Sequence, residues 1–143
     1  MRSRRVIPAS LRDSRVPSDT WAAPWKARCL RQATLFLTSG ARLMVDLEVR
    51  TRVYHGDVFL LDSGQIVAVQ ARPEYLLRIR DASEDTVAEL RAGRIPSSLR
   101  EDGLYVPADD LSAFAIRRAG IRAEEVFAVF EADMGNEEIR DDL

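Results

Sequence analysis

Residues 56–69 read GDVFLLDSGQIVAV, a stretch in which two apolar runs flank a short polar turn. The turn, Asp62-Ser63-Gly64, has the composition of a tight hairpin loop, and the runs beside it are rich in β-branched and aromatic residues. Upstream, residues 43–49 alternate apolar and polar side chains with a period of two, which is typical of a half-buried strand. Short strands with close turns predict an all-β domain, an antiparallel sheet or small barrel, over residues 28–74.

The pattern changes after residue 79. Ser83 is a good helix N-cap, and Gly93 is expected to end that helix in a left-handed conformation. Asp109-Asp110 opens a second helix, which Gly120 ends. Extended segments before, between and after these helices complete a β-α-β-β-α-β order, which predicts a ferredoxin-like α+β domain over residues 75–131. The chain is therefore expected to hold two small domains.

The two ends of the chain are expected to lie outside these domains. Residues 1–27 carry five arginines and three prolines, Pro8, Pro17 and Pro24, and are predicted to form a flexible basic arm. The arm is either a solvated tail, which is the favoured interpretation, or a contact for an acidic partner. Residues 132–143 are predicted to form an acidic tail.

Composition excludes several classes of function. One histidine and one cysteine cannot supply the usual four ligands of a closed transition-metal site, and they offer little for a catalytic triad. No phosphate-binding glycine loop is present, so the chain is not expected to be an enzyme. A net charge of −2 and the lack of a long apolar run argue against nucleic-acid and membrane partners. Cys29 has no partner for an internal disulfide, which suits a cytoplasmic protein.

Residues 91–96 read RAGRIP and place Arg91 and Arg94 close together in the chain. Guanidinium forks bind carboxylates well, which favours a binding surface. Positive charge also suits the C-terminal end of a helix, which explains the same residues without a partner. Both interpretations stay open.

The run from Gly56 to Ile79 resembles the end of the first domain in the urease accessory protein UreE family, whose members are nickel metallochaperones. Residues 103–111 (GLYVPADDL), the Ala119-Gly120 helix end and residues 130–135 (FEADMG) follow the family's second domain in order. The resemblance implies a peptide-binding-like β-domain and a ferredoxin-like metal-binding domain. It also implies a homodimer that holds nickel between protomers, with the urease apoprotein and its accessory proteins as partners.

The chain departs from the family at the nickel-binding histidine, which lies in a GNRH segment. If Ile95-Pro96 aligns with the apolar-Pro step of that segment, Arg94 stands where the histidine is expected, and arginine cannot ligate nickel at neutral pH. The chain's one histidine, His55, lies in the β-domain. The resemblance therefore implies a UreE-like accessory protein with a degenerate or weak nickel site and no assignable metal ligand. The predicted partner or dimer interface consists of Arg91, Gly93, Arg94, Ile95 and Pro96.

Two other functions remain open. The chain could be a protein-interaction module that keeps the UreE fold without binding metal. A third, less favoured function is binding of nucleic acid or a membrane surface through the basic arm of residues 1–27.

Overall fold

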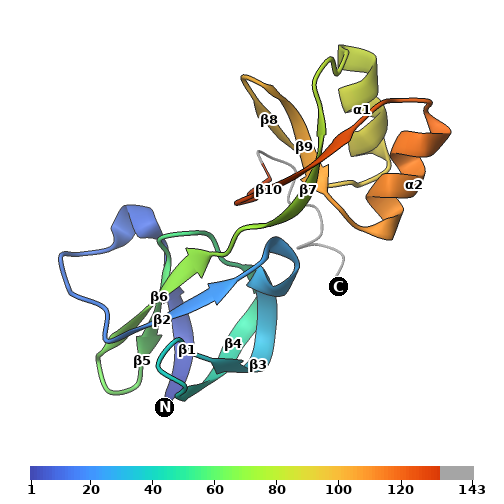
Figure 1. Cartoon of the computed structure of the whole chain (residues 1–143). Coiled ribbons are helices and arrows are strands. Elements are labelled where there is room, and N and C mark those ends of the chain that lie inside the picture. The colour runs from blue at the N-terminus through green and yellow to red at the C-terminus, as the bar shows by residue number, and fades with distance from the viewer. Residues whose placement is uncertain (133–143) are drawn as a thin grey trace. The chain divides into compact units, whose positions relative to one another are not determined.

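A computed structural model describes residues 1–132, which divide into two compact units (Figure 1). The first unit runs from Met1 to Arg72 and the second begins at Pro73. The boundary expected from the sequence lies nearby, between residues 74 and 75. Of the predicted acidic tail, only Ala132 lies within the described residues.

The first unit is a six-stranded β-sheet with the strand order β2-β6-β5-β1-β4-β3 (Figure 1). Its strands and short 3-10 helices are β1 (Arg2–Ile7), η1 (Ala9–Leu11), β2 (Asp19–Ala23), η2 (Trp25–Arg28), β3 (Cys29–Phe36), β4 (Arg42–Arg52), β5 (Val58–Leu61) and β6 (Ile66–Ala71). Just after β3, the backbone N–H of Thr38 donates to the carbonyl of Thr20 in β2 at 2.9 Å. Because β2 and β3 are opposite edges of the sheet, this bond shows that the sheet curls until its edges meet.

The predicted hairpin is confirmed, and the predicted alternation is confirmed in part. β5 and β6 pair antiparallel, and the N–H of Gly64 closes the turn on the carbonyl of Leu61 at 2.9 Å. In β4, Leu43 and Leu47 are buried as expected, but Val49 is 67% exposed. The pairing of β3 with β4 shifts register beyond Leu30, and this irregularity turns the Val49 side chain away from the core.

The prediction of a flexible arm at residues 1–27 is wrong. β1 lies inside the sheet, parallel to β4 and antiparallel to β5, and β2 pairs with β6. Ser3 is fully buried and its Oγ donates to the carbonyl of Leu60 at 2.8 Å, whereas the arginines of β1 are exposed. Strand pairing uses backbone groups, so a charged sequence can form an inner strand when its side chains reach water. Pro8, Pro17 and Pro24 lie between the strands, where their missing N–H costs no ladder bond.

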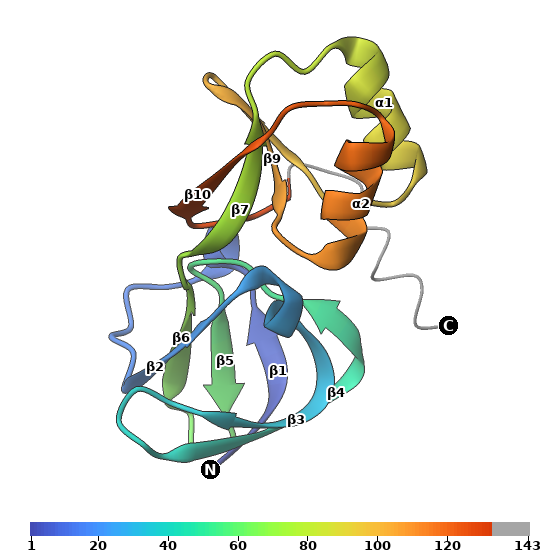
Figure 2. The same ribbon diagram turned by 45° about the vertical axis from the view of Figure 1, so that its right-hand side comes forward.

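The second unit is a four-stranded sheet with the order β10-β7-β9-β8, in which neighbouring strands are antiparallel. Its elements are β7 (Glu74–Ile79), α1 (Glu84–Ala92), β8 (Ser98–Arg100), β9 (Gly103–Pro107), α2 (Asp110–Arg118) and β10 (Glu124–Ala128). Both helices lie on one face of the sheet (Figures 1 and 2). Between the helices and the sheet lies an apolar core of Ile79, Leu90, Ile95, Leu104, Val106 and Ile116. Among the described residues, no helix is long and apolar enough to cross a membrane.

The order of helices and strands in this unit is the predicted one, and both helix starts are confirmed. Ser83 Oγ accepts the N–H of Thr86 at 3.1 Å, and Asp109 Oδ1 accepts the N–H of Ser112 at 2.8 Å. These bonds satisfy backbone donors that have no partner within the first turn of a helix. Gly103 begins β9 with φ +143°, and a Cβ atom there would lie 2.6 Å from the carbonyl oxygen of Ile79. The close approach of β7 and β9 therefore requires glycine at this position.

Candidate functional site

The segment predicted as a partner interface forms the end of α1 and the turn that follows it. The N–H of Arg94 donates to the carbonyl of Arg91 at 2.9 Å, and the N–H of Ile95 donates to that of Leu90 at 3.0 Å. This pair of bonds is a Schellman motif, in which a hydrophobic contact usually follows the helix end. Ile95 provides that contact, because its side chain is buried in the core of the second unit.

The left-handed residue of this motif is Arg94 and not Gly93, so the prediction for the helix end is wrong by one position. Arg94 has φ +61°, whereas Gly93 has φ −79°. The buried position of Ile95 decides the point at which the chain turns. An arginine in this conformation carries a steric cost that glycine avoids.

The two arginines of the segment have different surroundings. Arg91 is half-buried, and its Nε donates to Ser97 Oγ at 3.5 Å, whereas Arg94 is exposed. Gly93 is exposed and Pro96 is half-buried. The segment thus presents Gly93 and Arg94 at the surface of the unit. Its role as an interface stays a prediction.

His55 lies in the loop between β4 and β5, outside that segment. Its Nδ1 accepts the N–H of Ala71 at 3.1 Å, so a metal ion could bind this side chain only through Nε2. The next residue, Gly56, has φ +93°, and a Cβ atom there would lie 3.2 Å from the Cβ of Ala9. The tight turn therefore requires glycine at position 56. This glycine is the first residue of the run that resembles the UreE family.

Asp57 completes this loop by a structural contact that the sequence analysis did not find. Its Oδ1 accepts the N–H of Ala9 at 2.9 Å, and its Oδ2 accepts the N–H of Tyr54 at 2.8 Å. The side chain is 7% exposed, and the two bonds tie the connection after β1 to the connection after β4. The Gly-Asp pair at residues 56 and 57 therefore shapes the fold of this loop.

The described side chains include no cluster of the usual metal-binding residue types. Within residues 1–132, no group of three or more His, Cys, Asp or Glu residues could hold a metal ion. Cys29 is half-buried at the start of β3 and has no disulfide partner in the chain.

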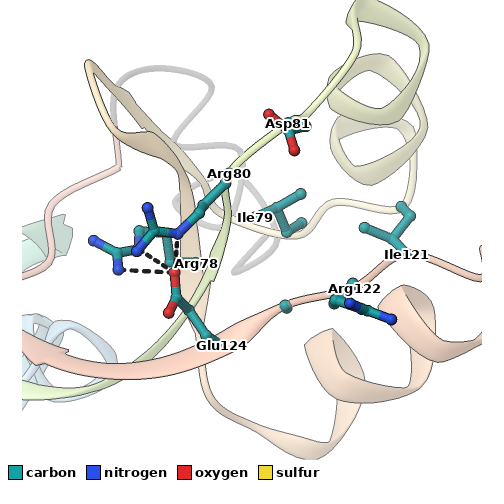
Figure 3. A pocket seen from close by; sticks show the side chains of 8 residues that line it. Arg78, Ile79, Arg80, Asp81, Ile121, Arg122 and Glu124 are labelled. Atoms are coloured by element: carbon teal, nitrogen blue, oxygen red, sulfur yellow. Dashed lines mark hydrogen bonds and ion pairs between the residues drawn. The ribbon is translucent and has the colours of Figure 1, made fainter.

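A cavity of about 380 Å³ lies in the second unit between the end of β7 and the start of β10 (Figure 3). Its charged lining residues are Arg78, Arg80, Arg122, Asp81 and Glu124. Glu124 Oε1 accepts bonds from Arg78 Nη2 at 2.7 Å and from Arg80 Nε at 2.5 Å. Figure 3 shows both guanidiniums converging on this carboxylate, while Arg122 points away from it. One wall of the cavity is therefore formed by an ion-pair cluster in which Arg78 and Arg80 share the carboxylate of Glu124.

The same network reaches two further elements of the sheet. Arg78 Nη1 donates to Asp102 Oδ2 at 2.9 Å, and the hydroxyl of Tyr105 donates to the same oxygen at 2.6 Å. Arg78 stands on β7, Glu124 on β10, Tyr105 on β9, and Asp102 in the turn between β8 and β9. Arg78 thus cross-links the strands of the second unit.

The charges of this network suit a structural role. Hydrogen bonds from Arg80 and Arg78 hold the pKa of Glu124 below its usual value. The hydroxyl of Tyr105, and after it Arg78, lower the pKa of Asp102. The contacts with Tyr105 and Glu124 raise the pKa of Arg78. A carboxylate with a lowered pKa is a weak base at neutral pH, so neither Glu124 nor Asp102 is suited to act as a general base.

Sequence reasoning missed this network. Neither Arg78 nor Glu124 carries a local sequence signal for this contact. The pairing of Arg78 with Glu124 follows from the register of β7 and β10, which only the folded sheet defines. The expected capping role of Asp109 is confirmed, because its side chain accepts the N–H of Ser112.

Comparison with known proteins gives one consistent result, although no family model matches the chain. The urease accessory protein UreE of Burkholderia lata is 32% identical over 128 residues, which is 85% of this chain and 60% of that protein. The protein of the same name from Ruegeria sp. (strain TM1040) is 30% identical over 120 residues, 83% of this chain and 68% of the relative. That of Rhodobacter capsulatus is 27% identical over 134 residues, 94% and 85% of the two chains. The chain spans about 60% of the length of the Burkholderia relatives it matches.

Proposed function

Because the chain belongs to the urease accessory protein UreE family, we propose that it is a non-catalytic accessory factor that aids assembly of the nickel centre of urease. The observation that carries this proposal is the similarity to the UreE protein of Ruegeria, which covers 83% of this chain and 68% of that protein. A urease apoprotein and its other accessory proteins are the partners that this role requires.

We further propose that nickel, the cargo of this role, is held weakly. Nickel favours imidazole ligands, and the chain contains a single histidine and a single cysteine. The Nδ1 atom of His55 already accepts a backbone hydrogen bond. If Ile95-Pro96 aligns with the apolar-Pro step of the family's segment, Arg94 stands where the nickel-binding histidine is expected. These observations support a contribution to urease assembly through protein contacts more than through tight metal binding.

The second unit is proposed to have the ferredoxin-like topology and to form a homodimer. Its element order and its strand order, β10-β7-β9-β8, support that topology. Exposed apolar side chains support a protein contact: Tyr75 and Phe127 are 61% and 62% exposed, with ring centroids 5.0 Å apart. The predicted interface at residues 91–96 is tested separately, by sedimentation of the wild-type chain and of the Arg91→Ala/Arg94→Ala variant. A dimer that weakens in the variant supports it, and an unchanged distribution counts against it.

The role in urease assembly is tested in the host organism. Deleting the gene should lower urease activity when nickel is scarce, and the intact gene should restore it. A second complemented strain carrying Arg91→Ala/Arg94→Ala asks whether that surface contributes to the role. Urease activity that is independent of the gene at every nickel concentration would overturn the proposal.

A further inference from the structure

The cavity beside the ion-pair cluster of the second unit contains two charged groups that the cluster does not use. It lies where β7 and β10 separate, because the last residues in register are Arg78 and Glu124, and its lining continues over residues 79–81 and 121–123. Its volume of about 380 Å³ falls within the range of about 300–1,000 Å³ that is typical of small-molecule sites. The space is therefore large enough for a small ligand.

Three arginines line the cavity, but their surroundings differ. Arg78 and Arg80 both bind Glu124, whereas the guanidinium of Arg122 bonds to no other described residue. Figure 3 shows the Arg122 side chain directed away from Glu124. Guanidinium groups bind carboxylates well, so Arg122 is open to a carboxylate of a ligand.

Asp81 is the corresponding carboxylate on the other side of the cavity. It lies in the turn between β7 and α1, and no other described residue binds its side chain. Asp81 and Arg122 form no ion pair with each other, although both line the cavity. The cavity thus separates one negative group from one positive group, and each is open to a ligand.

Apolar side chains lie between these two charges. Ile79 is 2% exposed and belongs to the core of the unit, and Ile121 and Ala123 are half-buried against that core. In Figure 3, Ile79 and Ile121 lie between Asp81 and Arg122. An apolar surface with one charge at each end fits a molecule of complementary pattern, which has an ammonium group, an apolar body and a carboxylate.

We propose that this cavity binds a small apolar zwitterion, a dipeptide of two aliphatic residues. Its carboxylate binds Arg122, its ammonium group binds Asp81, and its side chains cover Ile79 and Ile121. A simple anion would place a like charge near Asp81, and a simple cation would do so near Arg122, so a ligand with both charges is favoured. This inference does not depend on the role in urease assembly.

Titration of the isotope-labelled full chain with the dipeptide Leu-Leu tests the proposal by NMR. The amide signals of Ile79, Ile121 and Ala123 should shift with a Kd on the order of 1 mM or below. Acetyl-Leu-Leu lacks the ammonium group and Leu-Leu amide lacks the carboxylate, and each should bind about threefold or more weakly than Leu-Leu. The absence of shifts at about 10 mM Leu-Leu, or equal binding of the three probes, would overturn the proposal.

Two variants assign the ends of the ligand. Arg122→Gln should remove the preference for Leu-Leu over its amide, and Asp81→Asn should remove the preference over the acetylated form. The matched controls are Arg118→Gln and Asp85→Asn, which neutralise exposed side chains of α2 and α1 outside the cavity and should keep both preferences. Preferences that persist in the first two variants would overturn the proposed contacts. Preferences that are lost equally in the controls would overturn them as well, because the effect would then be one of general charge.

Discussion

Arg78 and Glu124 face each other across the β7–β10 pair, with Nε and Nη2 of Arg78 at 2.9 and 2.7 Å from the same carboxylate oxygen. Both side chains are part of the cavity wall, and Arg78 also reaches Asp102. One arginine on an inner strand thus joins an edge strand to the β8–β9 turn. Because the contact between Arg78 and Glu124 requires an ionised carboxylate, the stability of the second unit depends on pH.

Replacing Glu124 with Gln should destabilise the second unit near neutral pH, and the effect should shrink in acid. The pKa of Glu124 lies below its ordinary value of 4.5 because Arg80 and Arg78 bind the ionised form. A carboxyl with a lowered folded-state pKa stabilises the fold above its unfolded-state pKa, and this contribution is lost as the pH falls through the folded-state value. Urea unfolding of wild type and Glu124→Gln at about pH 7 and about pH 3 measures the difference. Glu125→Gln, at the next, exposed position of β10, is the matched control. An equal loss at both pH values would contradict the ion-pair explanation.

Removing residues 2–7 should abolish the cooperative unfolding of the first unit. These residues form β1, and their loss would leave the facing backbone groups of β4 and β5 without partners. Substitution of the three exposed arginines of β1 by glutamine keeps the strand and should leave the unit folded. Thermal unfolding followed by the fluorescence of Trp21 and Trp25, both buried in the first unit, compares the variants. A deletion variant that melts like wild type would restore the flexible-arm interpretation.

At position 94, glycine should be more stable than alanine by about 1 kcal/mol. Both substitutions remove the arginine side chain, so their difference isolates the cost of a Cβ atom at φ +61°. Denaturant midpoints of Arg94→Gly and Arg94→Ala, converted with a common slope, provide the measurement. Equal midpoints would mean that the helix end does not require a left-handed residue at this position.

Calorimetric titration with nickel should reveal no site with a Kd below about 1 μM. The chain has few preferred ligands, and His55 could contribute only its Nε2 atom. His55→Ala, measured alongside, should give the same result as wild type. A submicromolar site in the wild-type chain would refute the proposal of a weak site, and its loss in His55→Ala would identify the ligand.

Local signals in the sequence determined the elements whose stabilising contacts lie within a few residues. The Asp62-Ser63-Gly64 turn, the caps at Ser83 and Asp109, and the order of helices and strands after residue 74 follow from neighbouring side chains and backbone geometry. The motifs from Gly56 onward also indicated the family, which the relatives confirm.

Tertiary structure decided what depends on distant partners. The arginines and prolines of residues 1–27 gave no strand pattern, so β1 was not predicted. An inner strand is defined by the backbones that pair with it and not by its own hydrophobicity. Arg78 and Glu124 are 46 residues apart and meet only through strand register. Arg94 takes the left-handed position because Ile95 enters the core. In each case the sequence specified the groups that could pair, and packing across the whole unit selected the pairs that form, because strand order and register are properties of the assembled sheet.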